Sequence, residues 1–546
     1  MASDEQKEVT RAAGLMSVAV LMSRILGLVR EQVFAFFFGA GVETDAFQIA
    51  FRIPNLFRDL FAEGSMSSAL VPTFIDIRQR EGERRAWRLA GLAFRSLFLG
   101  TSLLAVIGIC FAPEIVEVYA SSFHKVEGQF ELTVELTRIL YPFFPFVVLA
   151  AAFMAILNAN RVFFLPAFAS ALFNLTTILT GVFGVVVVTP YFGWPKIYGM
   201  AIGFLLGGVV QCFSQYPKVV SVGYRWIKRK KDEPAWYKDP GLKKIWLLMG
   251  AGTFGMAATQ VNILVSSLLA TGEGPGAVSW LNYAFRLMQF PIGVFGVSLA
   301  AASLPLVSRA WSKQDIQGVS SGLFEGLKKV FAVNFPAMVG LMVLSVPLIR
   351  MIFQYGAFGV KDTQSTAYAL IAYAVGLVAY SGVKLMVPIC YATGRTRVAI
   401  LSSLFSVVLN ISFNLILIKK LSFLGLALGT SIAALSNFLF LLILHIQFIR
   451  ARGGVFHSKA LLKSFFQHLL LSGVMGGVLW FSFQGTESLF LNLTDFFGLV
   501  MARVTQVMSL VILGALFILG GGKLFSIHEI EEIFEIFTKR LKSRLK

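Results

Sequence analysis

Runs of about twenty or more apolar residues follow one another along almost the whole chain, separated by short charged stretches. A helix needs about 20 residues to cross the roughly 30 Å apolar core of a bilayer. Hydrophobic residues make up 56% of the chain and charged residues only 14%, which leaves too little polar surface for soluble domains. The sequence therefore predicts an all-α polytopic membrane protein with about 14 transmembrane helices. The predicted spans are roughly 12–38, 44–75, 89–112, 133–157, 165–189, 196–217, 242–270, 277–308, 320–353, 364–390, 398–418, 423–449, 461–484 and 496–521.

The connections between these spans alternate in charge. The connections on one side are rich in lysine and arginine, near residues 78–88, at Arg161, and near residues 218–244, 309–313, 395–397 and 450–463. The alternate connections offer only Lys125, Lys196, Lys361, Lys419 and Lys420. Because positively charged loops stay in the cytoplasm, both termini are predicted to be cytoplasmic and the number of spans to be even. The net charge of +19 is then a signal of topology, and a nucleic-acid partner is not needed to explain it.

Short sequence matches recur at one spacing of 233 or 234 residues, which is typical of a duplicated transporter. The matches are Gly39-Ala-Gly41 with Gly272-Glu-Gly274, Ala50-Phe51-Arg52 with Ala284-Phe285-Arg286, Leu70-Val71-Pro72 with Ser303-Leu304-Pro305, and Asn160-Arg161 with Gly394-Arg395. The spacing covers six spans, so the two halves share one orientation and are related by a pseudo-two-fold axis along the membrane normal. A cleft between these lobes is the expected substrate site.

The predicted domains follow from the repeat. They are an N-terminal lobe at 1–217, a basic cytoplasmic linker at 218–244, a C-terminal lobe at 245–450, two additional helices at 451–521 and a tail at 522–546. The tail has apolar residues at helical spacing and a basic end. It is predicted either to lie on the cytoplasmic face as an amphipathic helix or to be a solvated extension.

Several charged residues interrupt the spans, although a charge in the bilayer core is costly and usually faces a wet cavity. The basic members are Arg24, Arg30, Arg52, Arg58 and Arg286, and the acidic ones include Glu31, Asp45 and Asp59. Arginine binds phosphate and carboxylate through two parallel hydrogen bonds and stays charged. One interpretation is that these arginines bind an anionic substrate. The alternative is a structural role, with Arg24 paired to Glu31 and Arg52 paired to Asp45 or Asp59.

Other polar or helix-breaking residues allow two interpretations each. Pro54 and Pro291 interrupt the two repeated spans, either as hinges or as static kinks. Asn410, Asn414 and Thr430 could coordinate a cation, although such residues more often form hydrogen bonds between helices. No catalytic set, metal-ligand spacing or phosphate-binding loop is present in the sequence, so we expect a transporter without a bound cofactor rather than an enzyme.

Three stretches of the chain are especially specific: SRILGLVRE, FGAGVETDAFQIAFRIPNLFRDLFAEGSMSSALVP and VSWLNYAFRLMQFPIGVFGVSLAAASLP. They resemble the MviN/MurJ family of bacterial lipid II flippases. The family belongs to the multidrug/oligosaccharidyl-lipid/polysaccharide exporter superfamily, and the similarity extends along nearly the whole chain. It implies a carrier in the bacterial inner membrane that moves lipid II, the undecaprenyl-diphosphate disaccharide-pentapeptide, to the outer leaflet by alternating access.

The resemblance also implies roles for individual positions. The family's functional arginines correspond to Arg24, Arg30, Arg58 and Arg286, and its acidic cavity residue to Asp45. Arg52, Asn55 and Gln289 complete the expected substrate-binding set, and the spans at 451–521 would form the groove for the lipid tail.

Two positions depart from many relatives, because Gln289 and Asn414 stand where a carboxylate is common. Both departures weaken a carboxylate-based sodium or proton site, so a Na⁺ gradient, an H⁺ gradient and the membrane potential all stay open as driving forces. We expect a monomer in contact with membrane lipids. The alternative functions are export of another polyprenyl-diphosphate-linked glycan and antiport of cations or drugs.

Overall fold

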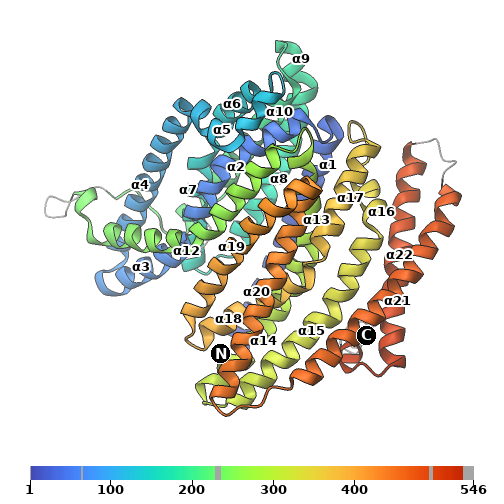
Figure 1. Cartoon of the computed structure of the whole chain (residues 1–546). Helices are drawn as coiled ribbons and strands as arrows, with labels where there is room; N and C mark the ends of the chain where they lie inside the picture. The colour runs from blue at the N-terminus through green and yellow to red at the C-terminus, as the bar shows by residue number, and fades with distance from the viewer. Residues whose placement is uncertain (1, 63–64, 228–234, 491–495, 533–546) are drawn as a thin grey trace. The chain divides into compact units, whose positions relative to one another are not determined.

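The computed structural model describes residues 2–62, 65–227, 235–490 and 496–532, and every regular element in these ranges is a helix (Figure 1). The chain divides into two compact units, Met1–Val278 and Ser279–Lys546. The helices of the first unit are α1 (Ala2–Phe38), α2 (Val42–Ala62), α3 (Ser65–Glu81), α4 (Glu83–Cys110), α5 (Ala112–Ala120), α6 (Gln129–Leu140), α7 (Phe143–Ala159), α8 (Phe164–Phe183), α9 (Thr189–Phe192), α10 (Lys196–Phe213), α11 (Tyr216–Ser221) and α12 (Pro240–Thr271). Short 3-10 or π turns cover Ser121–Lys125, Gly184–Val188 and Trp236–Lys238.

The second unit begins inside α13, two residues after the start of that helix, and contains the described helices that follow it. Its helices are α13 (Ala277–Pro291), α14 (Val297–Ser312), α15 (Ile316–Val343), α16 (Ser345–Ile352), α17 (Val360–Ala374), α18 (Leu377–Ala392), α19 (Thr396–Leu421), α20 (Phe423–Ala451), α21 (Ser458–Phe490) and α22 (Phe496–Leu524). A π turn, Ile292–Gly296, joins α13 to α14. Pro54 lies inside α2, whereas Pro291 is the last residue of α13.

The predicted membrane-spanning architecture is confirmed. Within the described residues, 10 helices are long and apolar enough to cross a membrane, or up to 11 if the bent pair α17–α18 counts as one span. The three other predicted spans coincide with α1, with α2 and α3, and with α12. The charged side chains in α1 and α2 lower the hydropathy of the first two predicted spans. The same side chains are the candidates for a binding role.

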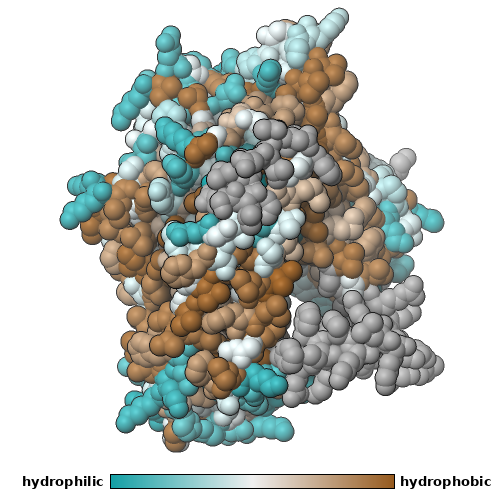
Figure 2. All heavy atoms as spheres, turned by 90° about the vertical axis from the view of Figure 1, so that its right-hand side faces the viewer, coloured by the Kyte–Doolittle hydropathy of each residue, from teal (hydrophilic) through white to brown (hydrophobic). Residues whose placement is uncertain are grey.

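Large apolar side chains lie exposed on many of these helices. Leu99 on α4 is 65% exposed and Phe481 on α21 is 75% exposed. Apolar residues make up much of the face drawn in Figure 2. Such a surface would be costly in water but matches the hydrocarbon of a bilayer.

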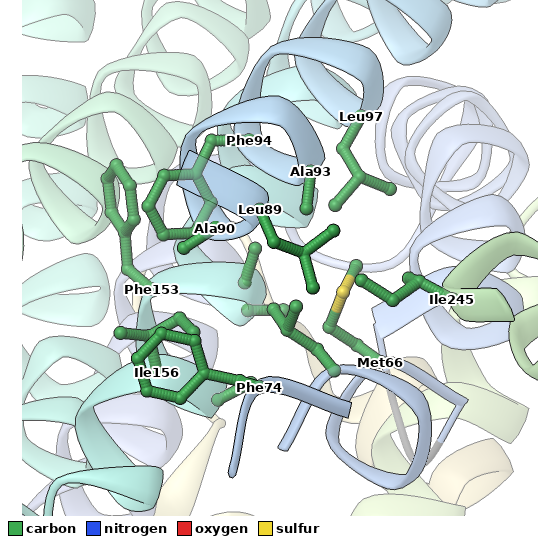
Figure 3. Packing of buried hydrophobic residues seen from close by; sticks show 14 of the residues in the cluster. Met66, Phe74, Leu89, Ala90, Ala93, Phe94, Leu97, Phe153, Ile156 and Ile245 are labelled. Carbon is green, nitrogen blue, oxygen red and sulfur yellow. The ribbon is translucent and has the colours of Figure 1, made fainter. Parts of the chain in front are cut away.

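The last helix of the first unit, α12, packs on α2, α3, α4 and α5. Its Ile245 is buried in the apolar cluster that contains Phe74 of α3 and Phe94 of α4 (Figure 3). The start of α12 is fixed by the buried Asp239, which accepts hydrogen bonds from the backbone of Gly241 and Leu242 at 3.0 and 3.3 Å. These contacts place α12 in the first unit, whereas the predicted second lobe begins at residue 245. Part of the predicted linker, residues 228–234, lies outside the described residues.

Glycines allow α8 and α10 to approach each other with their backbones in contact. A Cβ atom at Gly199 would lie 2.5 Å from the carbonyl carbon of Gly184, and one at Gly203 would lie 2.7 Å from the Cα of Gly181. Small residues at helix contacts are common in membranes, where close packing replaces the hydrophobic effect as the driving force. This close pair supports the site around α1 described below.

The second unit ends with α21 and α22, which pack on each other and on α15. Past α22 the chain turns back, and residues 528–532 are helical. The rest of the predicted amphipathic tail, residues 533–546, lies outside the described residues.

Candidate functional site

The predicted binding residues lie on three helices. Arg24 and Arg30 are on α1, and Asp45, Arg52, Asn55 and Arg58 are on α2 of the first unit, while Arg286 and Gln289 are on α13. Only three residues join α1 to α2, and the rings of Phe34 on α1 and Phe47 on α2 pack together near that connection.

Arg30 is buried, with 6% of its surface exposed. Its guanidinium group is 2.7 Å from the carboxylate of Glu31 and donates to Oδ1 of Asn174 on α8 at 3.0 Å. The rings of Phe173 and Phe204 flank it, with centroids 5.5 and 4.7 Å from Cζ. A buried charge needs a counter-charge and hydrogen bonds, and both are provided here. The structure therefore pairs Glu31 with Arg30, whereas the structural interpretation of the sequence had paired it with Arg24.

Asn174 is itself fixed by hydrogen bonds. Its Nδ2 donates to the carbonyl oxygens of Ser23 on α1 and Ser170 on α8, at 3.0 and 3.2 Å. The amide therefore joins α1 to α8 and determines where its oxygen can receive Arg30.

Arg58 is half-buried and also pairs with its neighbour in the sequence. Its Nη2 and Nε donate to Oδ1 of Asp59 at 2.7 and 3.0 Å. Asn55 donates to the other carboxylate oxygen of Asp59 at 3.4 Å. Asp59 is thus occupied by Arg58 and Asn55, which are one residue and one helical turn away.

Asp45 and Arg52 connect α2 to α12 and to the loop that follows it. The fully buried Asp45 accepts a hydrogen bond of 2.6 Å from the backbone N–H of Gly276. Gly276 has φ of 97°, a conformation that favours glycine, so the residue type matches the position. Arg52 donates to the hydroxyl of Ser267 on α12.

Arg24, Arg286 and Gln289 are the exposed members of the predicted set. Arg286 and Gln289 are three residues apart on α13, and residues at this spacing lie on neighbouring parts of one helix face. Because they are exposed, Arg286 and Gln289 are accessible to a ligand that approaches the second unit, and Arg24 is accessible to one that approaches the first.

The candidate ion site on α19 and α20 consists of amides and one hydroxyl. Asn414 donates to Asn410 at 2.9 Å, and Thr430 donates to the carbonyl oxygen of Leu426 in its own helix at 2.7 Å. A Cβ atom at Gly429 would lie 2.4 Å from Oδ1 of Asn414, so the amide sits directly against α20. Both hydrogen bonds lie within one helix, α19 or α20, and the two helices meet where Gly429 approaches Asn414. Within the described part of the chain, no group of three or more His, Cys, Asp or Glu side chains could hold a metal ion.

Three partners of the predicted residues were not identified from the sequence: Asn174, Ser267 and Gly276. Asn174 is a single amide within an apolar span, and such a residue could have been selected for the same reason as the arginines. Ser267 and Gly276 have no comparable signal, because serine and glycine are common in membrane helices and their loops.

Comparisons with known proteins agree with this architecture. A family model described as "Lipid II flippase MurJ" matches residues 34–518. The probable lipid II flippase MurJ of Vibrio cholerae is 32% identical over 485 residues, covering 87% of this chain and 89% of that protein. The lipid II flippase MurJ of Burkholderia cenocepacia is 33% identical over 469 residues, covering 85% of this chain and 89% of that protein.

Solved structures give the same fold. A lipid II flippase MurJ in an inward closed conformation aligns with a TM-score of 0.75 and 27% identity, covering 94% of this chain and 98% of that one. An inward-facing multidrug resistance transporter of the MATE family aligns with a TM-score of 0.64 and 16% identity, covering 81% of this chain and 99% of that one. At that identity the second likeness concerns the fold alone, and about a fifth of this chain has no counterpart in it.

Proposed function

Because this chain belongs to the MurJ family of lipid II flippases, we propose that it moves lipid II from the inner to the outer leaflet of the bacterial inner membrane. The family match over residues 34–518 carries this proposal. Lipid II delivers the disaccharide-pentapeptide for peptidoglycan synthesis, so the protein serves cell-wall synthesis as a transporter rather than as an enzyme.

We assign the diphosphate of lipid II to arginines in both repeats, Arg24, Arg30 and Arg58 in the first and Arg286 in the second. A guanidinium group binds phosphate through two parallel hydrogen bonds and keeps its charge at every physiological pH. The exposed Arg24 and Arg286 engage the diphosphate first. Arg30 and Arg58 already hold carboxylates, so the diphosphate must compete with Glu31 and Asp59 to reach them.

Transport then proceeds by alternating access. Binding of the anionic diphosphate neutralises part of the arginine charge, which lowers the cost of enclosing it away from water. The prenyl tail stays in contact with apolar helix surfaces, and the expected groove for it is at 451–521. Return of the empty, positively charged carrier is driven by the membrane potential or by a Na⁺ or H⁺ gradient, and one elementary charge crossing 100 mV is worth about 2.3 kcal/mol. We propose that the protein works as a monomer with both termini in the cytoplasm.

A liposome assay tests the substrate. Purified protein is reconstituted with fluorescent lipid II, and the fraction of label that becomes accessible to an external quencher is measured over time, with and without an imposed potential. Parallel liposomes contain a polyprenyl-diphosphate linked to a different glycan, or a lipophilic cation. Movement of lipid II alone supports the proposal, whereas movement of the cation without lipid II would favour an antiporter.

A complementation experiment tests the arginines. Arg24→Ala and Arg286→Ala are expected to abolish growth support at normal expression, and Arg24→Lys and Arg286→Lys to restore it only partly, because lysine cannot form the two parallel bonds. Arg397→Ala, which removes an exposed charge at the start of α19, is the matched control. Full growth of both alanine variants would exclude these arginines from diphosphate binding.

A further inference from the structure

The chain reverses direction immediately after α22. The backbone N–H of Ile527 donates to the carbonyl oxygen of Gly522 at 2.8 Å, and that of Ser526 donates to Lys523 at 3.3 Å. This pair of bonds is a Schellman motif, in which the residue at the turn adopts the left-handed conformation. That residue is Ser526, with φ of 50°. Glycine is the usual choice there and a serine costs roughly 1 kcal/mol, so contacts beyond the turn must hold it.

Apolar contacts supply part of that support. Ile527 and Ile530 are 5% and 2% exposed and belong to the apolar cluster that includes Leu471 of α21 and Ile518 of α22. A Cβ atom at Gly522 would lie 2.4 Å from Cγ2 of Ile530. Only glycine at this position allows the returning chain to lie so close to the last turn of α22.

A buried ion pair also holds the segment that follows the turn. Glu529 is 4% exposed and its carboxylate pairs with Nζ of Lys328 on α15. Nε2 of His468 on α21 lies 4.0 Å from its other oxygen. A second pair, Lys329 with Glu532 at 2.9 Å, is more exposed. One short segment thus contacts α15, α21 and α22 together.

Near its opposite end, α22 is attached to the residues where α16 ends. Nη1 of Arg503 donates to the carbonyl oxygens of Arg350 and Gln354, at 3.3 and 2.9 Å, where α16 ends. The guanidinium group also lies over the ring of Tyr355, 5.1 Å from its centroid. The helix is therefore fixed near both ends.

We propose that residues 527–532 form a strap that fastens α21 and α22 to α15, with the buried Lys328–Glu529 pair as its attachment. The added helix pair then moves together with α15 and α16 as one body during transport. The strap holds these helices together at one end of α22, and Arg503 holds them together near its other end.

Amide hydrogen exchange of the full-length protein in nanodiscs tests the strap without using any substrate, so its outcome is independent of the proposed function. Glu529→Lys and Lys328→Glu each place like charges in a buried site, and each is expected to raise exchange in residues 527–532 at least about tenfold. Exchange in residues 519–524, the last turns of α22, is expected to rise together with exchange in residues 527–532. The double variant Lys328→Glu with Glu529→Lys restores the pair and returns exchange to within about threefold of the unmodified protein.

The second, more exposed pair is the matched control. Lys329→Glu makes the same charge change on the adjacent residue of α15 and is expected to raise exchange less than about threefold. Glu529→Gln removes the charge without adding a like one, and it keeps the test informative if a reversal variant fails to fold. Unchanged exchange in residues 527–532 of the Glu529 variants would overturn the proposal. So would opening of that segment while residues 519–524 stay protected, because the segment would then not fasten α22.

Discussion

The two repeats use charge differently at equivalent positions. Arg52 and Asn55 of α2 correspond to Arg286 and Gln289 of α13, each 234 residues further along. Arg52 is half-buried and bound to Ser267, whereas Arg286 is exposed. One turn further on, α2 carries the pair Arg58–Asp59, and the corresponding positions are Ile292 and Gly293 in the π turn.

Helices at equivalent positions of the predicted repeat thus carry different charges. Two arginines of the first repeat pair with the carboxylate of the next residue, Arg30 with Glu31 and Arg58 with Asp59. The buried pair of the second unit, Lys328–Glu529, instead joins segments about two hundred residues apart. A local pair stabilises one helix face, whereas a distant pair connects elements, so we expect their loss to have different effects.

The largest effect is expected where a local pair is most buried. Glu31→Gln leaves the Arg30 guanidinium without its counter-charge and should lower the free energy of unfolding by about 3–5 kcal/mol. The more exposed Asp59→Asn should lower it by about 1 kcal/mol or less. Denaturant titration in mixed micelles measures both. An equal loss of unfolding free energy in the two variants would mean that burial does not determine how much each ion pair contributes to stability.

A smaller effect, on transport rather than stability, is expected at the exposed arginine of the second repeat. Arg286→Ala should lower the initial rate of lipid II flipping about a hundredfold, because a charged partner of the diphosphate is lost. Its free energy of unfolding should stay within about 0.5 kcal/mol of the unmodified protein, since the side chain is exposed. A stability loss as large as that of Glu31→Gln would place Arg286 in a structural role.

The distant pair should respond to pH. Burial raises the pKa of the Glu529 carboxyl, but its bonds to Lys328 outweigh burial and hold that pKa below the ordinary value of 4.5. A lowered pKa contributes stability above the ordinary value, and this contribution is lost as the pH falls through the value in the folded protein. The groups that face Glu529 are Lys328 of α15 and His468 of α21.

Exchange protection of residues 527–532, corrected for intrinsic rates, should therefore stay constant from about pH 8 to pH 5 and fall about tenfold only below the ordinary carboxyl range. Glu529→Gln should remove this step. A decline that begins above pH 5 would contradict a lowered pKa at this carboxylate.

The smallest effect is expected from making the second repeat resemble the first. Gln289→Glu places a carboxylate three residues after Arg286, and an exposed pair at this spacing is worth a few tenths of a kcal/mol. The apparent affinity for lipid II should weaken by about threefold or less, as measured from the concentration dependence of flipping. Gln289→Asn, which keeps an amide as at Asn55, should change it less.

Hydropathy was sufficient to predict the helices, and the same reading singled out the charges within them. An apolar run predicts a span because the bilayer requires it, and a helix lies at every predicted segment, including those whose arginines reduce their hydropathy. The specific stretches around Arg24, Arg58 and Arg286 were also enough to indicate the family.

The partners of those charges could not be predicted. Arg30 and Asn174 are 144 residues apart, and Asp45 and Gly276 are 231 apart. In a membrane most helix faces are apolar, so periodicity identifies a face but not the helix that covers it. The packing of α12 on α3 could not be predicted either, because Ile245 and Phe74 share an apolar cluster without any sequence signal, and the exposed ion pair Lys244–Asp76 joins residues 168 positions apart.

The left-handed turn at Ser526 has a practical consequence for experiments on this protein. A helix that ends in an open coil releases whatever follows it in many directions, but this turn sends the polypeptide back along the last turn of α22. A reporter domain or affinity tag joined directly after Glu532 would thus start next to α15. A spacer long enough to clear those helices is advisable before any such fusion is used to report on their motion.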